Sequence, residues 1–253
     1  MNAAWQAFAD ELARWHDAGR AIEFWWRDDD AVRPDPVLTR LLALAQSARV
    51  PLALAVIPAQ AEAAAFEDLG PAVAILQHGS DHRNRAGAAE KKTEFPASEP
   101  ALAAMERLVA ARKRLAGVAG AKLLPVLAPP WNRLSDSLVP HLVAAGFRGL
   151  SRYGARDATQ AVPGLVQVNT HADLIAWRSG RGFAGEAAVL AAAAGHLAAK
   201  RGGGADANEP TGWLSHHAVH DEAAWAFLER LFHMTRTAPG VRWLAAEELF
   251  HIP

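Results

Sequence analysis

Three consecutive aspartates follow an apolar segment near the start of the chain. Residues 21–26 are mainly apolar and lead into Arg27 and then Asp28, Asp29 and Asp30. Carboxylates held close together repel one another unless a cation or a shared proton offsets the charge, so this cluster favours a metal site or carboxyls with a raised pKa. A solvated turn whose aspartates cap a helix is the competing interpretation.

Two histidines four residues apart follow a second apolar segment. His78 and His82 lie in the sequence QHGSDHRN, directly after residues 73–77. If a helical turn begins here, both imidazoles lie on one face and can share a cation. Because the chain has 11 histidines, a chance pair of exposed loop histidines is the alternative. With one strand-end carboxylate, the pair would leave open positions that suit a catalytic Zn²⁺, and also Fe²⁺, Mn²⁺, Co²⁺ or Ni²⁺.

A proline-rich segment, LAPPWNR at 127–133, contains a third group of candidate residues. Its paired prolines stiffen the end of a strand, so Trp131 and Asn132 are presented at the rim. An indole ring held in this way can pack on a sugar face. Trp177 and Trp213 also lie beside candidate site residues, although for any single tryptophan a place in the core is the simpler interpretation.

The fourth group is GWLSHHAVHD, a strand-like segment at 212–221 that runs into three histidines. A histidine at a strand end can donate a proton to a leaving group, because its pKa is close to neutral pH. We assign that role to His216. The start of a helix at Asp221, with His217 and His220 on its surface, is the competing interpretation of the cluster, and we prefer it for His220.

Apolar strands alternate with amphipathic helices along most of the chain, which implies a parallel sheet. We expect strands over 21–26, 51–57, 73–77, 123–128, 147–150, 165–169, 212–215 and 241–244. We expect helices over 34–48, 99–116, 135–145, 184–200 and 221–236, and loops over 83–98 and 202–211. In parallel α/β folds, catalytic groups gather at the carboxyl ends of the strands, where the four groups above are placed.

Composition narrows the class of protein. A chain of 253 residues with 51% hydrophobic and 21% charged residues fits a single globular α/β domain, with residues 1–20 as an N-terminal helix packed on a domain formed by 21–253. The net charge of −1 gives no general attraction to nucleic acid, and the absence of cysteine excludes thiolate metal sites and a thiol nucleophile. With no export signal and no apolar run of about 20 residues, we expect a cytoplasmic protein without a membrane partner. The oligomeric state stays open.

Taken in order, the four groups resemble the polysaccharide deacetylase family, the NodB homology domain of carbohydrate esterase type, over most of residues 20–250. The order is an Asp-Asp strand end, His-x-x-x-His, a proline-rich aromatic strand end, and Leu-x-His. The resemblance implies a distorted parallel (β/α) barrel of the glycoside hydrolase/deacetylase type, which agrees with the alternation of strands and helices.

The resemblance also implies roles for the acids and the first histidine pair. Asp29 would be the general base, and Asp30, His78 and His82 would bind a divalent metal, with zinc preferred. Because the family has two acids where this chain has three, Asp28 as base with Asp29 on the metal is the other assignment.

Leu214 and His216 match the family's Leu-x-His, in which the histidine is the catalytic acid. We expect the substrate to be lined by Trp131, Asn132, Arg27, Asp173 and Leu214. The family commonly has an arginine where this chain has Ala128, so the usual partner of the base is missing. Arg27 or Arg133 are candidates to replace it, and Asp173 is a candidate to orient a positively charged group.

The function implied is removal of an acetyl or other acyl group from an N- or O-acetylated sugar, with metal-activated water as nucleophile. The first alternative is hydrolysis of a non-sugar carbon–nitrogen bond, such as a cyclic amide, on the same site. The second is a catalytically silent carbohydrate-binding barrel, which the change to Ala128 makes conceivable.

Overall fold

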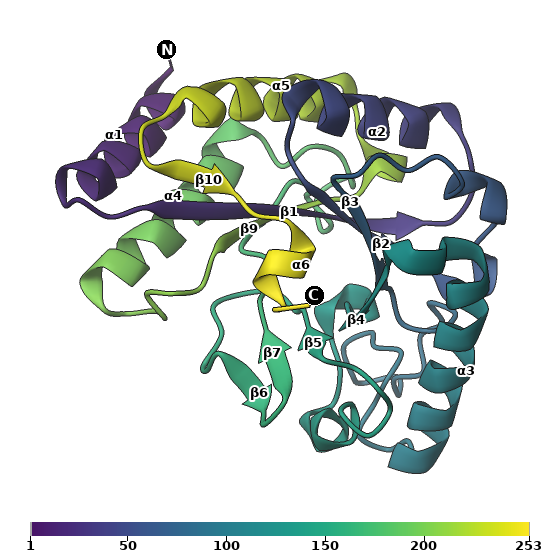
Figure 1. Cartoon of the computed structure of the whole chain (residues 1–253). Helices are drawn as coiled ribbons and strands as arrows, with labels where there is room; N and C mark the ends of the chain where they lie inside the picture. Colours follow the sequence, from purple (N-terminus) through teal and green to yellow (C-terminus); the bar gives the residue numbers. More distant parts are fainter. Residues whose placement is uncertain (1, 253) are drawn as a thin grey trace.

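One long central strand organises the sheet. The computed structural model describes residues 2–252, in which β1 (Ile22–Ala31) runs through the middle of the molecule (Figure 1). Its first residues pair with β10 (Val241–Trp243) and its last with β2 (Leu52–Val56), while β9 (Thr211–Ser215) pairs along its other edge. All three pairings are parallel.

The sheet continues from β2 through β3 (Val73–Gln77), β4 (Leu123–Leu127), β5 (Gly149–Leu150) and β7 (Leu165–Gln167) to the edge strand β6 (Gln160–Val162). On the other side of β1, β9 is followed by the short strand β8 (Ala172–Asp173). Among the described strands, only β6 and β7 pair antiparallel. The sheet curls into a partial barrel, so the predicted mixed α/β fold with a distorted parallel (β/α) barrel is confirmed.

Helices cover the outer face of the curled sheet (Figure 1). They are α1 (Ala3–Asp17), α2 (Pro36–Ala48), α3 (Ala101–Ala119), α4 (Glu186–Gly202) and α5 (Glu222–Thr237). A large apolar cluster lies between this face and the helices, and includes Phe24 and Trp26 of β1. A second cluster includes Trp25 of β1 and Phe250, which follows the short helix α6 (Ala246–Leu249). The two faces of β1 therefore enter two different cores, as the alternation of side chains along a strand requires.

Most predicted elements are present within a few residues of their expected bounds, but two differences stand out. The predicted helix at 135–145 is a short 3-10 segment, Asp136–His141, because Pro140 cannot donate the hydrogen bond that an α-helix needs there. The short elements β6, β8 and α6 were not predicted. Within residues 2–252, no helix has the length and apolar character needed to cross a membrane.

Candidate active site

The three aspartates of β1 point to different surroundings because of strand alternation and one irregularity. Arg27 and Asp29 lie on the inner face of the curled sheet with Trp25, whereas Asp28 lies on the outer face with Trp26. Strict alternation would also put Asp30 on the outer face. Instead, the pairing of β1 with β2 shifts register between residues 28 and 31, and Asp30 has a φ of 73°. A bulge of this kind re-aims a side chain, and here it brings Asp30 to the histidines.

His78 and His82 come together through a loop and not through a helical turn. β3 ends at Gln77, and the next residues form bends with Gly79 at φ 64° and His82 at φ 57°. The expectation of a helical turn was therefore wrong, although the two rings still approach each other, with centroids 5.3 Å apart. The tight turn between them replaces the helical spacing.

The oxygen and nitrogen atoms of the triad have the spacing of metal ligands. Asp30 Oδ1 lies 3.2 Å from His78 Nε2 and 3.3 Å from His82 Nε2. Ligands bound at about 2.0 Å to one tetrahedral ion lie roughly 3.3 Å apart. Asp30 Oδ1 is buried and accepts no well-aligned hydrogen bond, so it is an orphaned acceptor that a cation would satisfy. The residues therefore fit a divalent metal ion.

Backbone and charge prepare His78 for this role. Its Nδ1 donates to the carbonyl oxygen of Ala128 at 2.9 Å, which leaves the lone pair on Nε2 facing Asp30. Burial lowers the pKa of His78, but the carboxylates of Asp29 and Asp30 outweigh this and raise it. Burial raises the pKa of Asp30, but its close contact with His78 and the charge of His78 outweigh this and hold it well below its usual range. The pKa of His82 is lowered by burial and by the nearby His78.

Asp29 is held by the arginine two residues before it. Arg27 Nε and Nη2 donate to the two carboxylate oxygens at 2.8 and 3.0 Å, and both side chains are buried. Arg27 also donates from Nη1 to Ser151 Oγ at 2.6 Å and from Nη2 to Asn132 Oδ1. An arginine fork of this kind fixes the orientation of the carboxylate.

Of the two arginines expected as partners of the base, Arg27 is the one that binds Asp29. Arg133, the other candidate, donates to the backbone oxygen of Lys92 and contacts neither Asp29 nor the triad. We expected Arg27 to line the substrate, but its side chain has no exposed surface and contacts Asp29 instead. Asn132 likewise takes part as an acceptor for Arg27. Ser151, at the end of β5, was missed because a lone serine carries no sequence signal.

Asp28 has a separate environment. Its carboxylate is fully buried and accepts from Ser215 Oγ at 2.5 Å, from the backbone N–H of His217 at 3.0 Å, and from His217 Nδ1. Burial raises the pKa of Asp28, but the charge of His217 outweighs it and the net effect is a lowered pKa. With its oxygens occupied on the outer face, Asp28 is not placed beside the triad. The geometry favours the assignment with Asp29 and Asp30.

His216 follows β9 and faces Asp29. Its Nε2 lies 3.9 Å from Asp29 Oδ2, too far for a hydrogen bond, and its ring stands edge-on to Trp177 with centroids 4.6 Å apart. Asp173 accepts from Trp177 Nε1 at 2.8 Å, and burial raises the pKa of Asp173. The pair Asp173–Trp177 thus fixes one wall beside His216. Leu214 has no exposed side-chain surface, so it lies beneath the site and not on its surface.

Trp131 forms a second wall. Its ring lies 4.4 Å from the ring of His82, and both Trp131 and Asn132 have positive φ, near 56°. Trp213, in contrast, is fully buried among the aromatics of the outer core, as the simpler interpretation held. His217 and His220 are not surface residues of a helix: His217 is buried against Asp28, and both ring nitrogens of His220 are buried.

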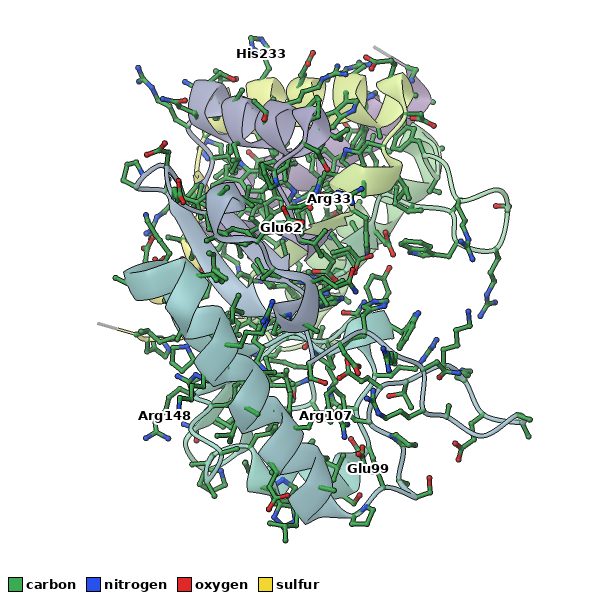
Figure 2. All side chains as sticks on the ribbon, turned by 90° about the vertical axis from the view of Figure 1, so that its right-hand side faces the viewer. Arg33, Glu62, Glu99, Arg107, Arg148 and His233 are labelled. Carbon is green, nitrogen blue, oxygen red and sulfur yellow. The ribbon has the colours of Figure 1, made fainter. Side chains whose placement is uncertain are left out.

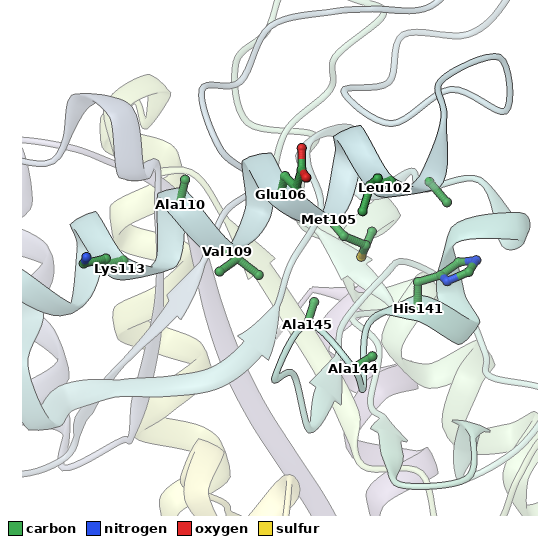
Figure 3. Close-up of a pocket in the computed structure, with 10 residues that line it drawn as sticks. Leu102, Met105, Glu106, Val109, Ala110, Lys113, His141, Ala144 and Ala145 are labelled. Carbon is green, nitrogen blue, oxygen red and sulfur yellow. The ribbon is translucent and has the colours of Figure 1, made fainter.

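A hollow of about 650 Å³ lies elsewhere, between α3 and the 3-10 segment near His141 (Figure 3). Its wall is mainly apolar, formed by residues such as Met105, Val109 and Ala145. No residue of the triad lines it, so the hollow is separate from the candidate active site.

A second group, His171, His196 and Glu209, also has ligand atoms close together, but its geometry differs from that of the triad. Two rings that bind one tetrahedral ion both contain the ion in their planes, with centroids roughly 5 Å apart. The rings of His171 and His196 are instead stacked, 3.4 Å apart at 13°. His171 Nδ1 accepts the N–H of Gly212 at 3.0 Å, so neutral His171 carries its proton on Nε2, 3.4 Å from Glu209. This arrangement does not fit a shared ion.

No protein-family model matches the chain, and no curated protein matches it. Solved structures do match. A putative polysaccharide deacetylase from Mycobacterium smegmatis has a TM-score of 0.64 at 17% identity, over 92% of this chain and 90% of that one. The chain has the polysaccharide deacetylase fold.

Two carbohydrate esterases share this deacetylase fold. A family 4 acetyl xylan esterase from Clostridium thermocellum, solved in complex with a cobalt ion, has a TM-score of 0.53 at 15% identity over 91% of each chain. A family 4 carbohydrate esterase from Streptomyces lividans, solved with acetate, has a TM-score of 0.56 at 13% identity over 87% of this chain and 90% of that one. The similarity extends over nearly the whole length of each chain.

Proposed function

We propose that this protein is a metal-dependent hydrolase that removes an acetyl group from an N- or O-acetylated sugar. The observation that carries the proposal is the joint placement of a fitted ligand triad, Asp30, His78 and His82, with Asp29 and His216 facing each other across 3.9 Å. The cobalt ion and the acetate reported with two proteins of this fold support the same chemistry.

A divalent ion, preferably zinc, held by the triad would polarise the acyl carbonyl and lower the pKa of a water molecule. Asp29 accepts a proton from the water molecule as the water oxygen attacks the carbonyl carbon. Each carboxylate oxygen has more than one acceptor position, so Asp29 can accept this proton while Arg27 holds it. His216 donates a proton to the departing nitrogen or oxygen, and acetate and the free amine or alcohol leave.

The walls of the site suit a sugar. Trp177 is 42% exposed and Trp131 is partly exposed, so each has ring surface left for a pyranose face. The ring of Trp177 lies against His216 and the ring of Trp131 lies against His82. We propose that they orient the sugar while its acyl group points toward the triad.

The test is acetate release from N-acetylated chito-oligosaccharides and from acetylated xylan, with metal content measured on the same preparations. We expect activity in the wild type, loss on chelation, and recovery with Zn²⁺ or Co²⁺. Asp29→Asn should lower kcat by about 10²–10⁴-fold while keeping the metal, whereas the exposed Asp17→Asn should match the wild type. Activity that survives both chelation and Asp29→Asn would contradict the proposal. Metal-dependent hydrolysis of simple amides only would move the substrate to non-sugar carbon–nitrogen bonds.

A further inference from the structure

We propose that Glu94 is a positioning residue that holds His82 in place for the metal, an inference that rests on the proposed function. Glu94 lies in the loop 83–98, outside every motif that the sequence singled out. Its side chain is fully buried and points into the turn between the two histidines.

One carboxylate binds the whole turn. Glu94 Oε1 accepts the N–H groups of Ser80 at 2.9 Å and Asp81 at 3.3 Å, and also the hydroxyl of Ser80. Glu94 Oε2 accepts the N–H of His82 at 3.1 Å. Three successive backbone N–H groups thus converge on one anion, as in the anion-binding nests of protein backbones.

Glycine permits this approach. A Cβ added to Gly79 would lie 2.3 Å from Glu94 Oε2, so no larger residue fits beneath the carboxylate. Arg85 and Arg107 place guanidinium nitrogens 3.8 and 3.9 Å from Glu94 Oε1. Arg107, on α3, also donates to Glu99, which directly follows the loop (Figure 2). This second contact holds the guanidinium group of Arg107 in place.

The need for such a clamp comes from the backbone of His82. A φ of 57° is uncommon for a residue with a side chain and persists only when its surroundings favour it. Glu94 accepts the backbone N–H of His82, so the carboxylate fixes the backbone from which the imidazole ring projects. Burial and the charge of Asp81 raise the pKa of Glu94, and the hydrogen bonds from Ser80 and from the N–H of Asp81 oppose this shift.

Glu94→Gln tests the positioning role of Glu94. The variant keeps the shape of the side chain but replaces one acceptor oxygen by an amide NH₂ group, which faces a backbone N–H donor. Outer partners of metal ligands typically contribute 10–100-fold to metal affinity, so we expect a loss of about that size for Zn²⁺. Glu90→Gln is the matched control, since Glu90 lies in the same loop and accepts only the N–H of Gly87 near the surface. It should bind Zn²⁺ as the wild type does.

Zn²⁺ affinity is measured by competition with a chromophoric chelator, and amide hydrogen exchange at residues 80–82 is measured on the metal-free proteins. Weaker binding and faster exchange in Glu94→Gln, with an unchanged thermal midpoint and a normal Glu90→Gln, would support the proposal. If Glu94→Gln does not fold, Glu94→Asp, which keeps the charge but reaches less far, decides by the same criteria. Wild-type affinity in the Glu94 variant would overturn the role of Glu94 alone. A wild type that binds no metal would contradict the proposed function, and this inference with it.

Discussion

At the scale of single residues, three adjacent and chemically identical side chains have three environments. Asp28 is buried against His217, Asp29 is paired with Arg27, and Asp30 is left with an unpartnered oxygen beside two histidines. The sequence alone allowed two assignments of base and ligand, because nothing in three equal letters says where the strand bulges. The alternation of faces along β1 and the positive φ of Asp30 separate them.

Asp28→Asn should destabilise the protein without removing the site. The change leaves His217, whose pKa the charge of Asp28 raises against the effect of burial, as a buried cation without its partner. Loss of one member of a buried ion pair costs about 3–5 kcal/mol, so we expect a drop of that size in the free energy of unfolding. Urea denaturation measures it. A variant as stable as the wild type but inactive would instead favour Asp28 as the general base.

At the scale of elements, the irregular joints of the sheet matter more than the regular strands. The ends of β1 and β3 carry the positive-φ positions that bring Asp30 and His82 to one point. The apolar run at 73–77 predicted β3 to the residue, whereas β1 continues through the aspartates to Ala31, beyond its expected end at residue 26. The turn after β3 was not predictable, because its shape depends on Glu94, which lies 12 residues beyond His82 in the sequence.

Gly79→Ala should damage this turn. The new Cβ would lie 2.6 Å from Pro130 Cδ as well as against Glu94, in a backbone conformation with φ 64°. Overpacking and strain together should lower the free energy of unfolding by about 2–4 kcal/mol. Gly87→Ala is the control, since its nearest neighbour would be 3.7 Å away. Equal urea midpoints for the two variants would contradict this explanation of the turn.

At the scale of the whole molecule, the two ends of the barrel differ: one end has the candidate active site, and the other, the structural end, has the buried group of His171, His196 and Glu209. The candidate site lies where β1, β3 and β9 end, while His171 and Glu209 precede β8 and β9 at the opposite end. The overall fold followed from the alternation of strands and helices. The stacked group did not, because it joins a loop, a helix and a second loop through buried contacts that no motif records.

That structural end should make the protein less stable in acid. Burial lowers the pKa of His171 to about 4. Burial alone would raise the pKa of Glu209, but its close contact with His171 outweighs this and lowers it to about 2. Between pH 6.5 and 4 the unfolded chain binds a proton at His171 that the folded chain does not, so stability is present above this range and falls through it. Below pH 4.5 the unfolded chain also binds a proton at Glu209 that the folded chain does not, so stability falls further as the pH drops toward 2.

Urea denaturation at a series of pH values measures this effect. His171→Asn should be less stable at neutral pH but should lose less stability between pH 6.5 and 4 than the wild type. His233→Asn, at an exposed position of α5 (Figure 2), should keep the wild-type slope. Identical slopes for wild type and His171→Asn would show that the stacked pair does not carry the acid sensitivity.

The most direct test of the metal site is elemental analysis of the purified protein after loading with Zn²⁺ and removal of the excess. We expect about one ion per chain in the wild type and in His171→Asn, and a large loss in Asp30→Asn, which keeps the size of the side chain but removes its charge. Asparagine also tolerates the positive φ at this position. Metal retained by Asp30→Asn and lost from His171→Asn would contradict the assignment of the triad, because the ion would then belong to the other end of the barrel.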